Sequence, residues 1–253
     1  MTIIVRRPWT QQPQGAVRGA AIRGLRNLWH FVQGNTRCLV TGANWTPPGI
    51  ASAIGWGPGY VDLSISSWDT SPATLPIAFD AIGPISVLIG YRRLGGTVAW
   101  SLMNPNLDGW YGLNTDQVST NNADFSGVVT PTSGPVVDAV NFIAMTMSAA
   151  NDFRVSMNGG PVALDSACAF PTPSSPNSTL RLGSDKLGEN KADVRVKYVA
   201  VFDRAMSNVE LLRYSANPWQ LFAPRRIIIP VGAAAATTFA PSWARHNSRV
   251  IGG

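Results

Sequence analysis

Paired carboxylates are the first groups to consider for chemistry, because two Asp or Glu residues at a fixed spacing carry the acid–base steps of retaining glycosidases. The chain has only two Glu residues, and neither is part of such a pair. Glu189 falls in a turn rich in Gly and Asn, while Glu210 follows Ser207 by three residues, as in a helix capping box. The carboxylates therefore predict local structure and no hydrolytic site.

Histidine, cysteine and glycine patterns give no stronger sign of catalysis. His30 and His246 have no neighbouring Asp–Ser pair for a triad and too few neighbouring ligands for a metal. Cys38 and Cys168 are too few for a zinc ribbon; they could pair, but buried free thiols are the preferred interpretation. The glycine-rich segment 55–59 lacks the Lys-Ser/Thr of a phosphate loop. We expect no enzyme, no cofactor and no metal.

One turn-rich segment has residues suited to binding a sugar or a calcium ion. Aromatic rings can stack on sugar rings, while Asp and Asn oxygens bind hydroxyl groups or a hard cation. The competing interpretation is structural, because Asn-Pro-Asn and Asp-Gly are common turn sequences and the aromatic residues could be half buried. The candidate glycan-binding residues are Asn106, Asp108, Trp110 and Tyr111.

Positive charge is concentrated at the two ends of the chain. Residues 1–37 contain six Arg and no acid, and residues 221–253 contain four Arg and no acid, so the ends carry +10 and the middle −4 of the net +6. The Arg residues are interspersed with Trp, Pro and Gly, which favours contacts with a protein over binding of nucleic acid, although they could also serve only solubility. The predicted partner-binding residues are Arg6, Arg7, Trp9, Arg18, Arg23, Trp243, Arg245 and Arg249.

The composition favours many short strands joined by turns. Only 13% of residues are charged, against about 25% in an average protein, whereas Gly and Pro together make up 43 residues (24 and 19). Alternating apolar runs between turn residues predict an all-β sandwich or barrel. The predicted strands are Arg37–Val40, Tyr60–Ile65, Ile85–Tyr91, Thr97–Met103, Trp110–Asn114, Asn141–Ser148, Phe153–Met157, Thr179–Leu182 and Val194–Phe202.

Two local signals are especially clear. Asn158-Gly159 directly follows an alternating strand and predicts a tight hairpin turn. The capping box that begins at Ser207 predicts a short helix to about Tyr214, before Pro218. The longest apolar run has ten residues, too few to span a membrane, and the N-terminus has no secretory signal, so we expect neither membrane insertion nor conventional export.

These features together resemble the laminin-G-like, concanavalin A-like lectin/glucanase domain. The resemblance covers roughly residues 80–222. It rests on the hairpin ending at Asn158-Gly159 and on the closing strand Val194–Phe202 with the sequence Asp203-Arg-Ala-Met-Ser207. The flanks, including Asn217-Pro-Trp-Gln-Leu-Phe222, resemble those of this domain in tailed-bacteriophage virion proteins. The resemblance implies a jelly-roll sandwich used for attachment; the paired carboxylates of the glucanases do not carry over.

The sequence therefore predicts a concanavalin A-like jelly-roll β-sandwich with one short C-terminal helix and extended arms. The expected divisions are a basic arm at 1–37, a sandwich at 38–230, and a linker with a second arm at 231–253. The function expected from the resemblance is a non-enzymatic virion protein, assembled in the host cytoplasm, that decorates the phage head. Its partners would be the major capsid protein or other virion proteins, and copies of itself, for instance in a trimer. The alternative is a tail or fibre protein that recognises host-surface glycan.

Overall fold

The structure is a computed structural model of the chain. In 98–103, 109–113, 118–122 and 125–129 only the backbone is described. The described residues are 22–32, 34–46, 54–63, 73–76, 84–96, 98–103, 109–113, 118–122, 125–129, 139–148, 152–166, 179–183 and 192–222.

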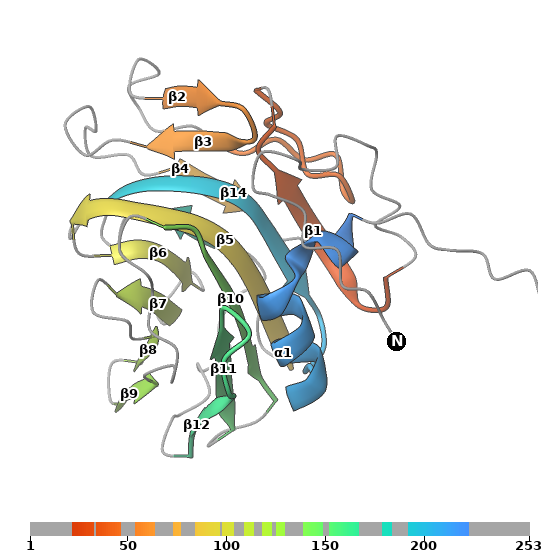
Figure 1. Cartoon of the computed structure of the whole chain (residues 1–253), viewed down its shortest axis with the longest axis vertical. Coiled ribbons are helices and arrows are strands. Elements are labelled where there is room, and N and C mark those ends of the chain that lie inside the picture. Colours follow the sequence, from red (N-terminus) through yellow and green to blue (C-terminus); the bar gives the residue numbers. More distant parts are fainter. Residues whose placement is uncertain are drawn as a thin grey trace, which may run out of the picture.

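Two antiparallel sheets form the fold (Figure 1). The larger, eight-stranded sheet is built around the long strand β14, which pairs with β5 on one side and with both β3 and β1 on the other. Its strands are, in spatial order, β12 (Ala163–Asp165), β11 (Phe153–Met157), β10 (Asn141–Met147), β5 (Ile85–Gly96), β14 (Ala192–Phe202), β3 (Tyr60–Leu63) and β2 (Ile54–Gly57), with β1 (Leu25–His30) beside β14.

The second sheet has six strands and faces the first. Its strands are, in spatial order, β4 (Ala73–Pro76), β13 (Thr179–Leu182), β6 (Val98–Met103), β7 (Gly109–Leu113), β8 (Val118–Asn122) and β9 (Phe125–Val129). The larger sheet curves around the smaller one in Figure 1, so the two sheets enclose a common interior.

Alternating side chains of the larger sheet fill this interior. On β14, Val194, Val196, Val199 and Val201 belong to the core between the sheets, and each is at most 1% exposed. The change of parity between Val196 and Val199 coincides with a register shift against β5. Burying a side chain of this kind contributes about 1.5–3 kcal/mol, so the alternation fixes which face of the strand points inward.

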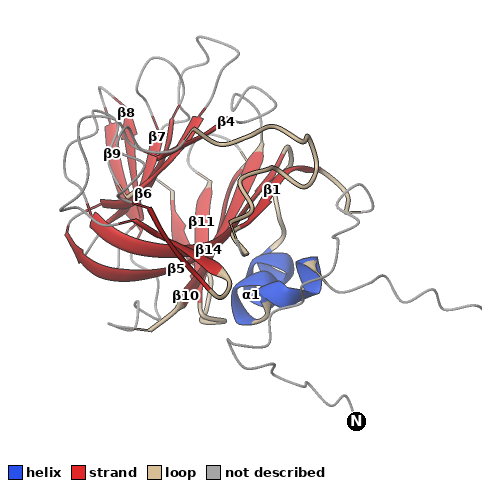
Figure 2. Cartoon of the chain, turned by 90° about the horizontal axis from the view of Figure 1, so that it is seen from above, coloured by secondary structure: helices blue, strands red, loops and turns tan. Residues whose placement is uncertain are grey.

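The opposite, outer face of the larger sheet is covered over part of its area by the helix α1 (Asn208–Ala216) and the short helix η4 (Pro218–Leu221). A second apolar cluster lies there, in which Leu211 and Leu221 of the helices pack with Phe202 of β14. Figure 2 shows α1 on this side of the sandwich, away from β6 to β9. The part of the outer face around Arg195, farther along β14, lies outside this cluster.

The predicted all-β sandwich with one short C-terminal helix is confirmed. The structure differs at the N-terminal boundary, because β1 lies inside the range assigned to the arm and is paired with β14. Trp29 and Phe31 of this segment are almost fully buried, which is why it belongs to the sandwich. The predicted strand at 37–40 is instead a turn region with a single bridge from Arg37 to Asn44. Cys38 is a buried free thiol, as the sequence suggested.

Candidate functional site

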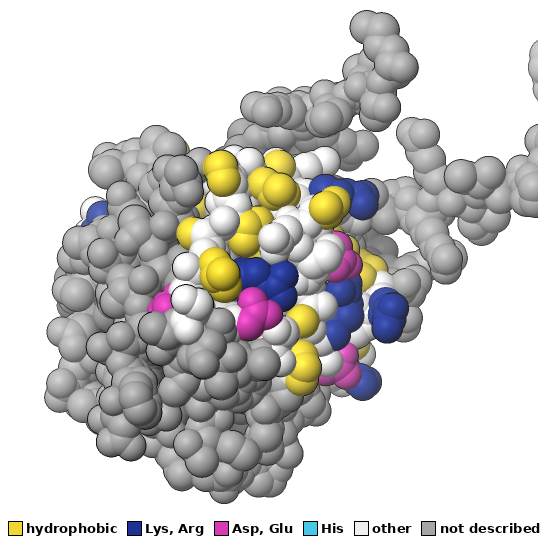
Figure 3. Space-filling model, turned by 90° about the horizontal axis from the view of Figure 1, so that it is seen from below, with side chains coloured by type: hydrophobic (Ala, Val, Ile, Leu, Met, Phe, Trp, Pro, Cys, Tyr) yellow, Lys and Arg dark blue, Asp and Glu magenta, His cyan; other side chains and the backbone are white. Residues whose placement is uncertain are grey.

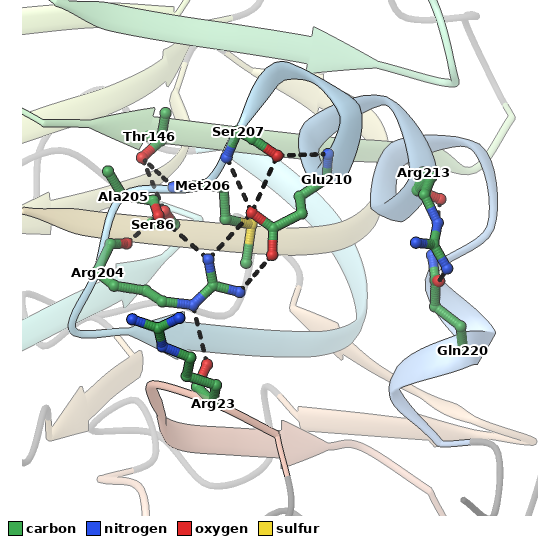
Figure 4. Close-up of polar contacts among 10 residues, drawn as sticks. All are labelled: Arg23, Ser86, Thr146, Arg204, Ala205, Met206, Ser207, Glu210, Arg213 and Gln220. Carbon is green, nitrogen blue, oxygen red and sulfur yellow. Dashed lines mark hydrogen bonds and ion pairs between the residues drawn. The ribbon is translucent and has the colours of Figure 1, made fainter. Parts of the chain in front are cut away.

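A dense polar network lies where β14 leads into α1 (Figure 4). Arg204 donates two hydrogen bonds to the Glu210 carboxylate, at 2.6 and 3.1 Å, and its Nε donates to the carbonyl of Arg23. Glu210 also accepts a hydrogen bond from the backbone N–H of Ser207, whose hydroxyl accepts one from the N–H of Glu210. The predicted capping box is therefore confirmed, and Arg204 ties it to the N-terminal segment.

The electrostatics of this network are those of a structural element. Hydrogen bonding from Arg204, followed by that from Ser207, lowers the pKa of Glu210 to about 2. Such a carboxylate stays ionised at neutral pH and cannot serve as a general acid there. The network fixes the start of α1 and the direction in which the chain leaves β14.

Two buried hydroxyl groups anchor the same turn to the sheet. Ser86 donates to the carbonyl of Arg204 at 2.7 Å, and the Thr146 hydroxyl accepts a hydrogen bond from the backbone N–H of Met206 at 3.1 Å. Ser86 and Thr146 also bond to each other across β5 and β10. All four groups are satisfied within the protein, so the hydroxyls are not poised as nucleophiles.

A cluster of aromatic rings and two basic side chains lies under η4 on the outer sheet face. The ring of His30 lies 4.5 Å from that of Phe222, and Lys197 Nζ lies 6.0 Å from the centre of the Trp219 ring. Tyr198 packs edge-on against both Trp219 and Phe222. Lys197 has no exposed surface and His30 is only 5% exposed.

Burial suppresses the charge of both basic groups in this cluster. Desolvation lowers the pKa of Lys197 to about 6. Desolvation, together with repulsion from Lys197, lowers the pKa of His30 to about 4. Both side chains are therefore mostly neutral at pH 7 and are themselves buried, whereas Trp219, which lies over Lys197, is only partly buried.

Farther along β14 the outer face reaches solvent and carries a row of polar side chains. The register places Asp62 of β3 beside Arg195 of β14, and Arg92 of β5 on the other side of Arg195. Arg195 Nε donates to Asp62 at 2.7 Å, and its guanidinium carbon lies 5.2 Å from the centre of the Tyr60 ring. The Arg195 and Asp62 side chains are 31% and 26% exposed. This row is the best candidate for a binding surface among the residues that the structure describes.

The structure places one of the predicted arm residues. Arg23 is exposed in a turn just before β1, and its carbonyl accepts the hydrogen bond from Arg204, so this residue is fixed to the sandwich. The other predicted arm residues lie outside the described part of the chain: Arg6, Arg7, Trp9, Arg18, Trp243, Arg245 and Arg249.

The predicted glycan loop is described only in part. Asn106 and Asp108 lie outside the described residues. Trp110 and Tyr111 belong to β7, where their backbones pair with β6 and β8 inside the six-stranded sheet. Trp110 and Tyr111 therefore lie on the six-stranded sheet, whereas the row at Arg195 lies on the larger sheet.

Tyr60, Asp62 and Arg195 were not among the site residues predicted from the sequence. The signal that was present is a charged residue between two buried apolar ones, in Val61-Asp62-Leu63 and Val194-Arg195-Val196. Alternation of this kind indicates an outward-facing position on a strand, but it does not say which strands are neighbours.

Within the described ranges, no group of three or more His, Cys, Asp or Glu residues could hold a metal ion. No helix among them is long and apolar enough to cross a membrane. On the described part of the face in Figure 3, basic side chains lie next to acidic ones and between apolar ones. That mixture differs from the continuous basic surface typical of nucleic-acid binding.

No protein-family model matches the chain, and no curated protein matches it. Among solved structures, Trypanosoma rangeli sialidase matches over 78% of this chain and 33% of its own, with a TM-score of 0.56 and 13% identity. The botulinum neurotoxin serotype G binding domain matches over 78% and 51%, with a TM-score of 0.55 and 12% identity. A structure concerned with the dependence of botulinum neurotoxin type C on two ganglioside molecules matches over 79% and 52%, with a TM-score of 0.55 and 10% identity.

The chain spans about a third to a half of the length of these neighbours. At this identity the likeness shows a shared β-sandwich fold and no shared site. It nevertheless corrects one expectation. The prediction that the chain is not an enzyme was wrong. Parts of sialidases have the same fold, and one fold can host both binding proteins and enzymes, so this fold does not exclude an enzyme.

Proposed function

We propose that this chain is a carbohydrate-binding β-sandwich, which recognises a glycan on a host surface through the open part of its outer sheet face. The observation that carries the proposal is the solvent-accessible set of Tyr60, Asp62 and Arg195, in which donors and an acceptor are held on a rigid sheet. Saccharides are bound by hydrogen-bonding groups placed in this way. The shared fold with the neurotoxin binding domains supports the proposal at the level of architecture.

A glycan array probed with the purified, labelled protein tests this proposal. We expect binding to a limited set of saccharides, and we expect Tyr60→Ala to reduce it because Arg195 loses the ring on which it rests. Trp110→Ala serves as the comparison, since Trp110 represents the other candidate site. Loss of binding in Trp110→Ala together with full binding in Tyr60→Ala would contradict the assignment to the outer face. Absence of binding to any saccharide would contradict the function.

A second candidate is attachment to a tailed-phage particle, for example as a head decoration protein that docks through its arms onto the capsid protein. The specific observation that favours it is the charge distribution, with ten Arg and no acid in residues 1–37 and 221–253 together. Arg and Trp are common energetic anchors of protein contacts. The flank Asn217-Pro-Trp-Gln-Leu-Phe222, which resembles that of this domain in tailed-bacteriophage virion proteins, also supports this candidate.

Immunogold electron microscopy of particles, with antibody against the sandwich, tests the second candidate. Label on the head would support decoration, and loss of that label on deletion of 239–253 would support docking through the arm. Label confined to the tail would favour receptor recognition by a virion-bound copy of the carbohydrate-binding sandwich. Particles without label would contradict a place in the virion.

A further inference from the structure

Arg195 is held in one orientation by contacts on two sides. Its Nε donates to Asp62 Oδ2 at 2.7 Å, and its guanidinium group lies over the Tyr60 ring. The Tyr60 ring lies over Gly57 of β2. A methyl group added to Gly57 would lie only 2.1 Å from the ring carbon Cζ of Tyr60. Glycine at this position therefore lets the ring lie flat on the sheet, and the ring supports the guanidinium.

The outer edge of the same guanidinium is available to a ligand. Within the described part of the chain, Arg195 bonds through Nε, while Nη1 and Nη2 have no hydrogen-bond partner. Asp62 uses Oδ2 for this contact and leaves Oδ1 as an acceptor. The hydrogen bond that Arg195 donates to Asp62 raises the pKa of Arg195, so the group is charged at any pH of interest.

We propose that Arg195 binds the carboxylate of an acidic sugar through its two terminal nitrogens, while Asp62 Oδ1 accepts a hydrogen bond from a neighbouring hydroxyl group. The inference rests on the proposed carbohydrate-binding function and names its ligand class. A guanidinium presents two parallel N–H donors that match a planar carboxylate. Asp62 offsets part of the positive charge, which favours a singly charged carboxylate over a doubly charged phosphate, and its free oxygen suits a sugar ring that also carries hydroxyl groups.

Holding the Arg195 side chain in one orientation lowers the entropic cost of ligand binding. An arginine side chain that is free in solution loses rotamer entropy when a ligand fixes it. Here the ion pair with Asp62 and the stacking on Tyr60 impose that restriction before the ligand arrives. Pre-organisation of this kind increases affinity without additional contacts.

The test compares saccharides that differ only in the acidic group. Sialyllactose is paired with lactose, and oligogalacturonate with oligogalactose, and affinities are measured by calorimetry for the full-length protein. We expect the acidic member of a pair to bind more tightly. Arg195→Lys, which keeps the charge but loses the two-donor edge, should weaken acidic binding roughly ten-fold or more and leave neutral binding unchanged. Arg213→Lys, at an exposed position on α1, is the matched control and should change neither.

Asp62→Asn provides a second variant, because the amide oxygen can still accept from Arg195 Nε and preserve the orientation. It should retain the preference for the acidic member. If the acidic and the neutral saccharide of a pair bound equally, and Arg195→Lys changed neither affinity, the acidic ligand class would be wrong. The proposed function would then still stand. A preference that survives Arg195→Lys would overturn the role of Arg195. Failure of all four saccharides and of the wider array to bind would overturn the proposed function as well. Thermal unfolding of each variant confirms that it is folded.

Discussion

Lys197 Nζ lies 6.0 Å from the centre of the Trp219 ring, in a position with no solvent exposure on the central strand of the larger sheet. A register shift in β14 between Val196 and Tyr198 accompanies this placement. A buried ammonium is costly, and the protein avoids the charge by holding Lys197 neutral. Lys197 therefore opposes folding at every pH at which its amine would be protonated in the unfolded chain.

Replacing this lysine with an apolar residue should stabilise the protein. For Lys197→Met we expect the free energy of unfolding at pH 7 to rise by about 1–4 kcal/mol, because the unfolded chain no longer gains from protonating the amine. Urea unfolding followed by circular dichroism measures the change. Arg213→Met, which loses one exposed hydrogen bond to Gln220, is the control and should change stability by less than about 1 kcal/mol. A destabilised Lys197→Met would show that the amine makes a contact worth more than its desolvation.

Stability should fall as the pH falls from about 10 to about 4. The folded-state pKa of Lys197 is lowered to about 6, so between that value and its ordinary pKa of 10.5 the unfolded chain binds the extra proton. His30, lowered to about 4 from 6.5, extends the same trend to lower pH. Each group changes stability by at most about 1.4 kcal/mol per pH unit inside its window. Urea midpoints across this range measure the slope.

Two variants separate the contributions to this slope. Lys197→Met should flatten the profile above about pH 6.5 and leave the fall below it, whereas His30→Phe should flatten the part between pH 6.5 and 4. A wild-type profile that is level between pH 7 and 10 would contradict the neutral state of Lys197.

The turn after β14 should depend on Glu210 in two distinguishable ways. Glu210→Ala removes both the cap to the Ser207 N–H and the ion pair with Arg204, and we expect a loss of about 1–2 kcal/mol. Glu210→Gln can still cap the helix, so its loss should be smaller. Urea unfolding at pH 7 measures both variants. If they were equally destabilised, the ion pair, and not the cap, would carry the effect.

Gly90 should be a sensitive position in β5. A methyl group there would lie 2.5 Å from Cε1 of the buried Tyr198 ring, so Gly90→Ala should cost about 1–3 kcal/mol through overpacking. Gly95→Ala in the same strand is the matched control, because its nearest contact would be 3.7 Å, and we expect little change. Thermal unfolding reports both. Recovery of stability in Gly90→Ala combined with Tyr198→Leu would attribute the loss to the ring, and equal effects of the two alanines would argue against it.

Elements with strong local signals could be predicted from the sequence. The strands Phe153–Met157 and Thr179–Leu182 have the bounds that the sequence indicated, and the helix begins at its capping box. Alternation and capping are local properties, so a sequence pattern is enough to detect them. The strand Leu25–His30 was missed because Arg26 and Asn27 interrupt its alternation, and its structure depends on pairing with β14 far along the chain.

The candidate site could not be predicted for a related reason. Asp62 and Arg195 are 133 positions apart, and each by itself resembles an ordinary outward-facing charge. Their contact depends on the register between β3 and β14, which the local sequence does not determine. Tyr60 likewise gains its role only because Gly57 lies opposite it in β2.

The central claim, carbohydrate binding on the outer sheet face, is tested most directly by mapping the bound surface in solution. The ¹⁵N-labelled protein would be titrated with the saccharide that binds most tightly on the array, and amide chemical shifts would be recorded. We expect the largest shifts at residues 60–63 and 194–197, on β3 and β14. Shifts confined to residues 104–111, or the absence of shifts on the larger sheet at saturation, would contradict it.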